Sequence, residues 1–171
     1  MKRVLAMALI LLCLLGLVGC KSSSLPEEMP EDFSFAIRWN TNGISSYDSL
    51  IGALVKDAKA AEPKDYTTEY FLTDEEKQQI YAMIRELKPY DYPDLYEPKD
   101  QGVLTEKTEP LTLTVRMNDT EKTIRAQNTA GWHASKDQKA QKLLAAANAI
   151  EVLLEASEAW KALPDYEQFY E

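Results

Sequence analysis

The chain has 171 residues, and its 28 acidic against 19 basic side chains give a formal net charge of −9. That balance argues against a nucleic-acid partner, because phosphates must be neutralised by Lys and Arg. One histidine excludes multi-histidine metal sites, and the six glycines form no phosphate-cradling loop. We therefore expect no metal and no cofactor.

A secretory signal opens the chain. Lys2 and Arg3 precede an apolar run from Val4 to about Leu15, too short to cross a bilayer comfortably. The run ends in Leu17-Val18-Gly19-Cys20, which resembles the lipobox of bacterial lipoproteins. The resemblance implies cleavage before Cys20 and acylation of its thiol. Residues 1–19 are then a lipoprotein signal peptide, and the protein is anchored by lipid on the extracytoplasmic face of the cell membrane.

Loss of the signal changes the chemistry open to the mature chain. Lys2 and Arg3 leave with it and no acidic residue does, so the net charge falls from −9 to −11. No polybasic segment follows the anchor, so the domain itself has no electrostatic reason to lie on anionic lipid. Cys13 is removed and Cys20 is acylated, which excludes a disulfide, a thiol nucleophile and a zinc–thiolate site.

Residues 20–32 are rich in Ser, Pro and Glu and predict a disordered tether. A single folded domain is expected over residues 33–164, with a short tail at 165–171. Its first strand, residues 33–40, alternates apolar and polar positions and places Phe33, Phe35, Ile37 and Trp39 on one face. A turn at 40–43, two short strand pieces at 45–49 and 53–56 bent at Gly52, and a strand at 66–72 follow.

Thr73 and Glu76 form a capping-box pattern that predicts the start of a helix. Apolar residues at helical spacing follow, and Pro89 ends the pattern; the stripe is Ile80, Met83, Ile84 and Leu87. Residues 89–110 contain four prolines and are expected to be irregular.

A second alternating strand at 111–117 turns at Asn118-Asp119 and returns over 121–126. Ser135 with Gln138 is a second capping-box candidate, and a helix is expected from there to Trp160. Leu163-Pro164 ends it.

The elements predict an α+β fold: a single antiparallel sheet of four to five strands with two helices packed on one face. The expected order is strand, strand, strand, helix, strand, strand, helix. The succession of Phe33–Trp39, Tyr47–Ser49, Leu72–Glu76, Leu111–Met117 and a final long helix resembles small bacterial lipoproteins and secreted domains of unknown function. The resemblance covers roughly residues 33–163 and implies no particular activity.

Tyrosines and acids gather in the Pro-rich segment, where Tyr90, Asp91, Tyr92, Asp94 and Tyr96 are candidate binding residues. Rings with a polar tip suit protein interfaces and sugar stacking. The alternative is that they pack the segment against the sheet edge. The acids, with Glu97 and Asp100, could hold Ca²⁺ or supply a glycosidase pair, but no EF-hand pattern is present and a solvated loop explains them.

His133 stands alone in a loop, and Ser45, Ser46 and Asp48 are its conceivable companions. No Gly-X-Ser-X-Gly elbow occurs, so no catalytic residue is assigned. The Ser45–Asp48 set could instead line a binding edge.

The sequence favours a non-enzymatic, lipid-anchored binding or interaction domain with a protein or glycan partner in the cell envelope. One alternative is a carboxylate-based hydrolase acting on envelope polysaccharide. Another is an inhibitor or immunity-type protein that presents the aromatic segment to a secreted enzyme.

Overall fold

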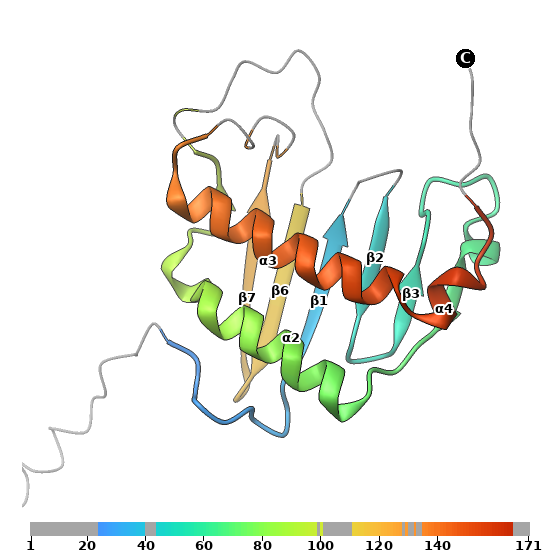
Figure 1. The fold of residues 1–171 in the computed structure, drawn as a ribbon, viewed down its shortest axis with the longest axis horizontal. Helices are drawn as coiled ribbons and strands as arrows, with labels where there is room; N and C mark the ends of the chain where they lie inside the picture. The colour runs from blue at the N-terminus through green and yellow to red at the C-terminus, as the bar shows by residue number, and fades with distance from the viewer. Residues whose placement is uncertain are drawn as a thin grey trace, which may run out of the picture.

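The computed structural model describes residues 24–39, 44–98, 100, 111–127, 129, 132 and 135–165. They form an α+β fold in which one mixed, seven-stranded sheet is covered on one face by helices α2 and α3 (Figure 1). The strand order is β4-β3-β2-β1-β6-β7-β5. In the described part of the chain, no helix combines the length and apolar character needed to span a bilayer.

The strands are β1 (Ser34–Trp39), β2 (Ser45–Asp48), β3 (Ala53–Val55), β4 (Thr67–Glu69), β5 (Leu95–Tyr96), β6 (Leu111–Met117) and β7 (Thr120–Ala126). The helices are α2 (Asp74–Leu87), α3 (Gln138–Glu155) and the short α4 (Glu158–Lys161). Two 3₁₀ turns, η1 (Pro63–Tyr66) and η2 (Pro89–Asp91), complete the elements.

The expectation of a purely antiparallel sheet with four to five strands is wrong. The pieces on either side of Gly52 are separate paired strands, because a φ of 66° at Gly52 reverses the chain between them. β5, inside the Pro-rich segment, pairs with β7 in parallel over two residues. A strand of two residues is too short to show the alternation of apolar and polar residues from which strands are predicted.

The core lies between the sheet and the two helices, as the alternation in the first strand predicts. Phe33, Phe35, Ile37 and Trp39 are all buried under the helices. From the helix side, α2 contributes Ile80 and Ile84, which are fully buried. The predicted two-residue hairpin turn is confirmed, since Asn118 and Asp119 both have positive φ.

Helix α2 begins with the predicted capping box. The Glu76 amide donates to Thr73 Oγ1 at 3.2 Å, and the Thr73 amide donates to Glu76 Oε2 at 2.8 Å. Two of the amides that a helix start leaves unpaired are thus satisfied.

Replacing Thr73 with Ala is expected to lower the free energy of unfolding by about 1 kcal/mol, because one amide of the first turn loses its acceptor. Urea unfolding followed by circular dichroism measures the change. Gln78→Ala, in the exposed part of the same helix, is the control and should stay within about 0.5 kcal/mol of the wild type. Equal effects of the two substitutions would contradict the capping role.

The second predicted capping box is wrong, and so is the single long helix. α3 is capped by Asp137, whose side chain accepts from the Lys139 amide at 2.9 Å, while Ser135 Oγ accepts from the Asp137 amide. α3 ends at Glu155, and Ser157 then caps α4 by accepting from the Trp160 amide at 3.1 Å. A serine that can satisfy a new helix start explains the break within a strongly helical sequence.

The described part of the segment expected to be a disordered tether, residues 24–32, lies against helix α2. Leu25 is buried in the core cluster. Tyr81 Oη donates to the Pro26 carbonyl at 2.7 Å, and Arg85 Nη1 donates to the Glu27 carbonyl at 2.6 Å. These contacts fix the path of the chain just before β1.

Candidate functional site

In the part of the chain that the structure describes, no second layer of helices or strands covers the face of the sheet opposite α2 and α3 (Figure 1). Because side chains alternate along a strand, the residues between the core positions point to this face. The register places there one apolar residue, Val55, and a set of small, hydroxylated or charged residues: Ser34, Ala36, Arg38, Ser46, Asp48, Ala53, Thr112, Thr114, Arg116, Glu121, Thr123 and Arg125. We call this set the open face.

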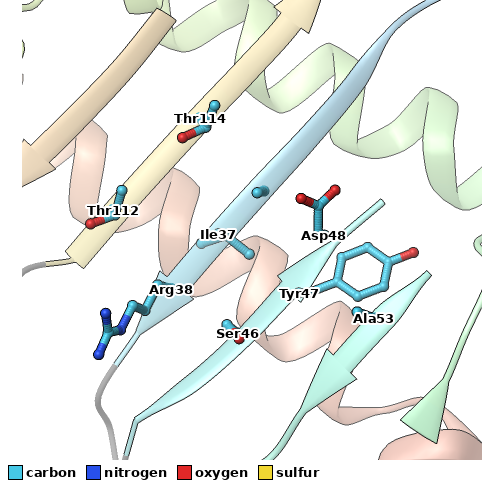
Figure 2. A pocket seen from close by; sticks show the side chains of 9 residues that line it. Ile37, Arg38, Ser46, Tyr47, Asp48, Ala53, Thr112 and Thr114 are labelled. Atoms are coloured by element: carbon cyan, nitrogen blue, oxygen red, sulfur yellow. The ribbon is translucent and has the colours of Figure 1, made fainter. Parts of the chain in front are cut away.

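The centre of the open face is hollowed. A shallow depression of about 300 Å³ spans β1, β2, β3 and β6 (Figure 2). Ala36 and Ala53, the partners of Asp48 on either side, have methyl side chains and form its low floor. A second depression, of about 510 Å³, lies over β7 and β5 and is lined by Asp94, Leu95, Glu121, Thr123 and Arg125. Both depressions are open to solvent and differ from an enclosed ligand cavity.

One end of the open face is held together by charge pairs across three strands. Arg116 on β6 donates through Nη1 to Asp48 on β2 at 3.2 Å and through Nε to Glu121 on β7 at 2.9 Å. Arg116 and Asp48 are each a little under one-third exposed. Next to them, the hydroxyls of Thr114 and Thr123 lie 2.9 Å apart. This network fixes the orientation of these polar side chains.

The candidate tyrosines do not form one exposed group. Tyr92 and Tyr96 are buried and meet edge to face at 5.1 Å, and Tyr96 meets the buried Trp132 in the same way at 5.4 Å. Tyr92 Oη donates to the Lys139 carbonyl at 2.9 Å. Tyr90 is partly exposed, and its hydroxyl lies 3.1 Å from Thr120 Oγ1. Two of the three tyrosines thus attach the Pro-rich segment to the sheet and α3.

The candidate acids have structural partners or face solvent. Asp91 is exposed, and the exposed Asp94 forms an ion pair with Lys122. That hydrogen bond and charge lower the pKa of Asp94, and hydrogen bonds from Ser135 and the Lys136 amide lower the pKa of Asp100. A glycosidase acid needs a raised pKa, so neither carboxyl suits that role. Within the described ranges, no cluster of three or more His, Cys, Asp or Glu side chains is arranged to hold a metal ion.

Cys20 and His133 lie outside the described residues. Of the polar set at 45–48, the buried Ser45 points to the core, whereas Ser46 and Asp48 belong to the open face. Sequence reasoning missed Arg38, Thr112, Arg116 and Arg125 as members of the same surface. These residues occupy the polar positions of the alternating strands, and that alternation is the signal that could have identified the surface.

No protein-family model matches this chain, and no curated protein matches it either.

Proposed function

We propose that this protein is a non-enzymatic, lipid-anchored binding domain on the extracytoplasmic face of the bacterial cell membrane, and that its open face binds a protein partner. The observation that carries the proposal is the open face itself, a broad sheet surface with a hollowed centre. The small side chains of Ala36 and Ala53 allow the backbone of a partner to come close to the sheet. A broad and shallow surface of this kind suits contact with a macromolecule, whereas a small molecule usually binds in an enclosed pocket.

An antiparallel sheet can also leave one face in water, usually covered by long charged side chains. Two features of the open face favour binding over simple solvation. Its centre is formed by Ala36, Ala53 and threonines in place of long side chains. Its principal charge pair, Arg116 with Asp48, is already ordered and partly shielded, which lowers the entropy lost on association.

The proposed anchor holds this surface near the membrane. The four residue-to-residue steps from the acylated Cys20 to Ser24, where the described chain begins, span at most about 14 Å. From Leu25 onward the chain is fastened to α2. The domain is thus held close to the membrane, within reach of a partner in the cell envelope.

Replacing Cys20 with Ala is expected to move the protein out of the membrane fraction, because each buried CH₂ of an acyl chain contributes about 0.8 kcal/mol to membrane binding. Fractionation of cells and mass spectrometry of the new amino terminus measure this. Cys13→Ala, within the signal itself, is the control and should leave acylation unchanged. An unmodified Cys20 in the wild-type membrane fraction would contradict the anchor.

The open face is tested by Ala36→Arg, which fills the central depression without touching the core. Quantitative mass spectrometry compares proteins recovered with each tagged variant from cross-linked cells. A specific partner should fall at least tenfold with Ala36→Arg and stay unchanged with Val152→Arg, which places the same side chain on the exposed surface of α3. Equal recovery with both variants, at unchanged circular dichroism, would overturn the proposal.

A further inference from the structure

Strand β4 is the last strand at one edge of the sheet among the residues that the structure describes. Its register pairs Thr68 with Leu54 on β3, and the Tyr70 amide donates to the Gly52 carbonyl at 2.7 Å. Alternate residues of an antiparallel strand direct their backbone groups to opposite sides, so those of Glu69 point away from β3. Within the described ranges, neither backbone group of Glu69 has a hydrogen-bond partner. The sheet thus ends in an unpaired edge.

Three apolar side chains lie beside this edge, each about three-fifths exposed: Leu50, Ile51 and Phe71. Leu50 and Ile51 belong to the turn between β2 and β3. The ring of Phe71 lies against the same turn, since a Cβ atom added to Gly52 would be 2.7 Å from it. Figure 1 shows this turn at the end of the sheet where α2 begins. Exposed apolar residues are usually scattered singly, so three together favour a contact surface. We call these three residues the apolar corner.

The edge is closed at one end and open at the other. An edge that must stay unpaired is usually protected by proline, a bulge or several charges. β4 consists of Thr67, Thr68 and Glu69, two residues that favour strands and a single charge. The Thr67 amide is already used, because it donates to the Lys64 carbonyl of η1. An added segment therefore finds its free backbone partners at Glu69, next to the apolar corner.

The charge around the edge is negative. Residues 62–77 contain six acids and two lysines, and neither lysine offsets the strand itself. Lys64 is paired with Glu62 at 3.7 Å, and Lys77 is partly buried in α2. Glu69 is exposed and has no ion pair with another described residue. A second copy of this acidic chain is therefore a poor partner for the edge, whereas a segment that carries Lys or Arg complements it.

We propose that β4 takes up an extended segment of a partner protein as an additional strand, a contact that does not depend on what binds the open face. The backbone groups of Glu69 supply the strand hydrogen bonds, and the side chains of the segment supply specificity. Glu69 and Phe71 are two positions apart and point to the same face of the sheet. The segment that fits has a basic residue opposite Glu69 and, two positions along, a large apolar residue against the apolar corner.

The probe is a short fluorescein-labelled peptide in which an arginine and a phenylalanine, two positions apart, alternate with threonines. Fluorescence anisotropy measures its binding to the purified protein. Glu69→Pro removes the outward amide but leaves the bonds to β3, and should weaken binding about tenfold. Phe71→Ser should weaken it to a similar degree, because the apolar contact is lost. Val152→Ser removes a similarly exposed apolar side chain from α3 and should have no effect.

Two further readouts separate the backbone contact from the charge. Glu69→Gln keeps the amide and loses the charge, so its effect should be smaller than that of Glu69→Pro and should disappear at high salt. Hydrogen exchange of the Glu69 amide should slow when the wild type binds the peptide. An exchange rate that does not change on binding would contradict the added strand.

No binding by the wild type, or equal binding by Glu69→Pro at unchanged circular dichroism, would overturn the inference. So would a wild-type dimer that Glu69→Pro converts into a monomer in sedimentation, because the edge would then hold a second copy. Ala36→Arg, three strands away from β4, should retain peptide binding. Loss of binding with that variant would place the peptide on the open face. The test of the edge and the test of the proposed function are therefore decided separately.

Discussion

Replacing Phe35 with Ala is expected to lower the free energy of unfolding by about 3–5 kcal/mol, the largest effect of any single substitution considered. Phe35 is fully buried on the core face of β1. Its ring centroid lies 6.2 Å from that of Phe33 and 5.7 Å from that of Tyr47. Removing it leaves a cavity where the sheet meets the helices, and the loss is comparable to a large part of a small domain's stability.

The adjacent residue supplies a matched control. Ala36 is on the same strand but points to the open face, so Ala36→Ser should change the unfolding free energy by less than about 0.5 kcal/mol. Urea unfolding monitored by tryptophan fluorescence measures both variants. A small effect at Phe35, or similar effects at the two positions, would show that β1 does not place its faces as described.

Raising the pH from 10 to 12 is expected to destabilise the fold steeply. Burial raises the pKa of Tyr47 and of Tyr92 to about 12, against 10 for an exposed tyrosine. Below pH 10 both states keep the proton, so the stability from these groups is fully present. Above pH 10 the unfolded chain loses protons that the folded chain retains, so stability falls by about 1.4 kcal/mol per pH unit for each such tyrosine.

Urea unfolding at a series of pH values from 9 to 11.5 measures the slope. Tyr47→Phe/Tyr92→Phe should reduce the slope without abolishing it, because burial also raises the pKa of Tyr70, Tyr81 and Tyr96. This variant is less stable at neutral pH because two hydroxyl hydrogen bonds are lost. A wild-type stability that is independent of pH over this range would contradict the buried state of the two rings.

Local signals in the sequence predicted the elements that local interactions define. The Thr73–Glu76 capping box and the Asn118-Asp119 turn each depend on residues a few positions apart, and both are confirmed. The alternation from Phe33 to Trp39 identified the core face of β1 correctly, because burial follows the two-residue period of a strand.

Contacts between distant segments were not predictable in the same way. Residues 24–32 have a composition typical of disorder, yet Tyr81 and Arg85, more than fifty positions away, bind their carbonyls. β5 exists because Leu95 and Tyr96 meet an unpaired edge of β7. In each case the backbone groups of one segment form hydrogen bonds with a segment that is distant in the sequence. The composition of a segment does not predict such contacts.

The candidate site likewise depends on contacts between distant segments, which the sequence alone did not predict. The sequence drew attention to a cluster of tyrosines and acids, but Tyr92 and Tyr96 are buried against Trp132 and α3. The open face is assembled from one or two outward residues per strand, and only the strand order brings Arg38, Thr112 and Arg125 into one row.

The central claim is that a protein partner lies on the open face, and site-specific photo-cross-linking in living cells tests it most directly. A photoreactive amino acid replaces Ser46 on the open face in one strain and Val152 on the outer surface of α3 in another. We predict a discrete cross-linked adduct, identified by mass spectrometry, from position 46 and none from position 152. Adducts from position 152 alone would place the partner on the helical layer and contradict the account.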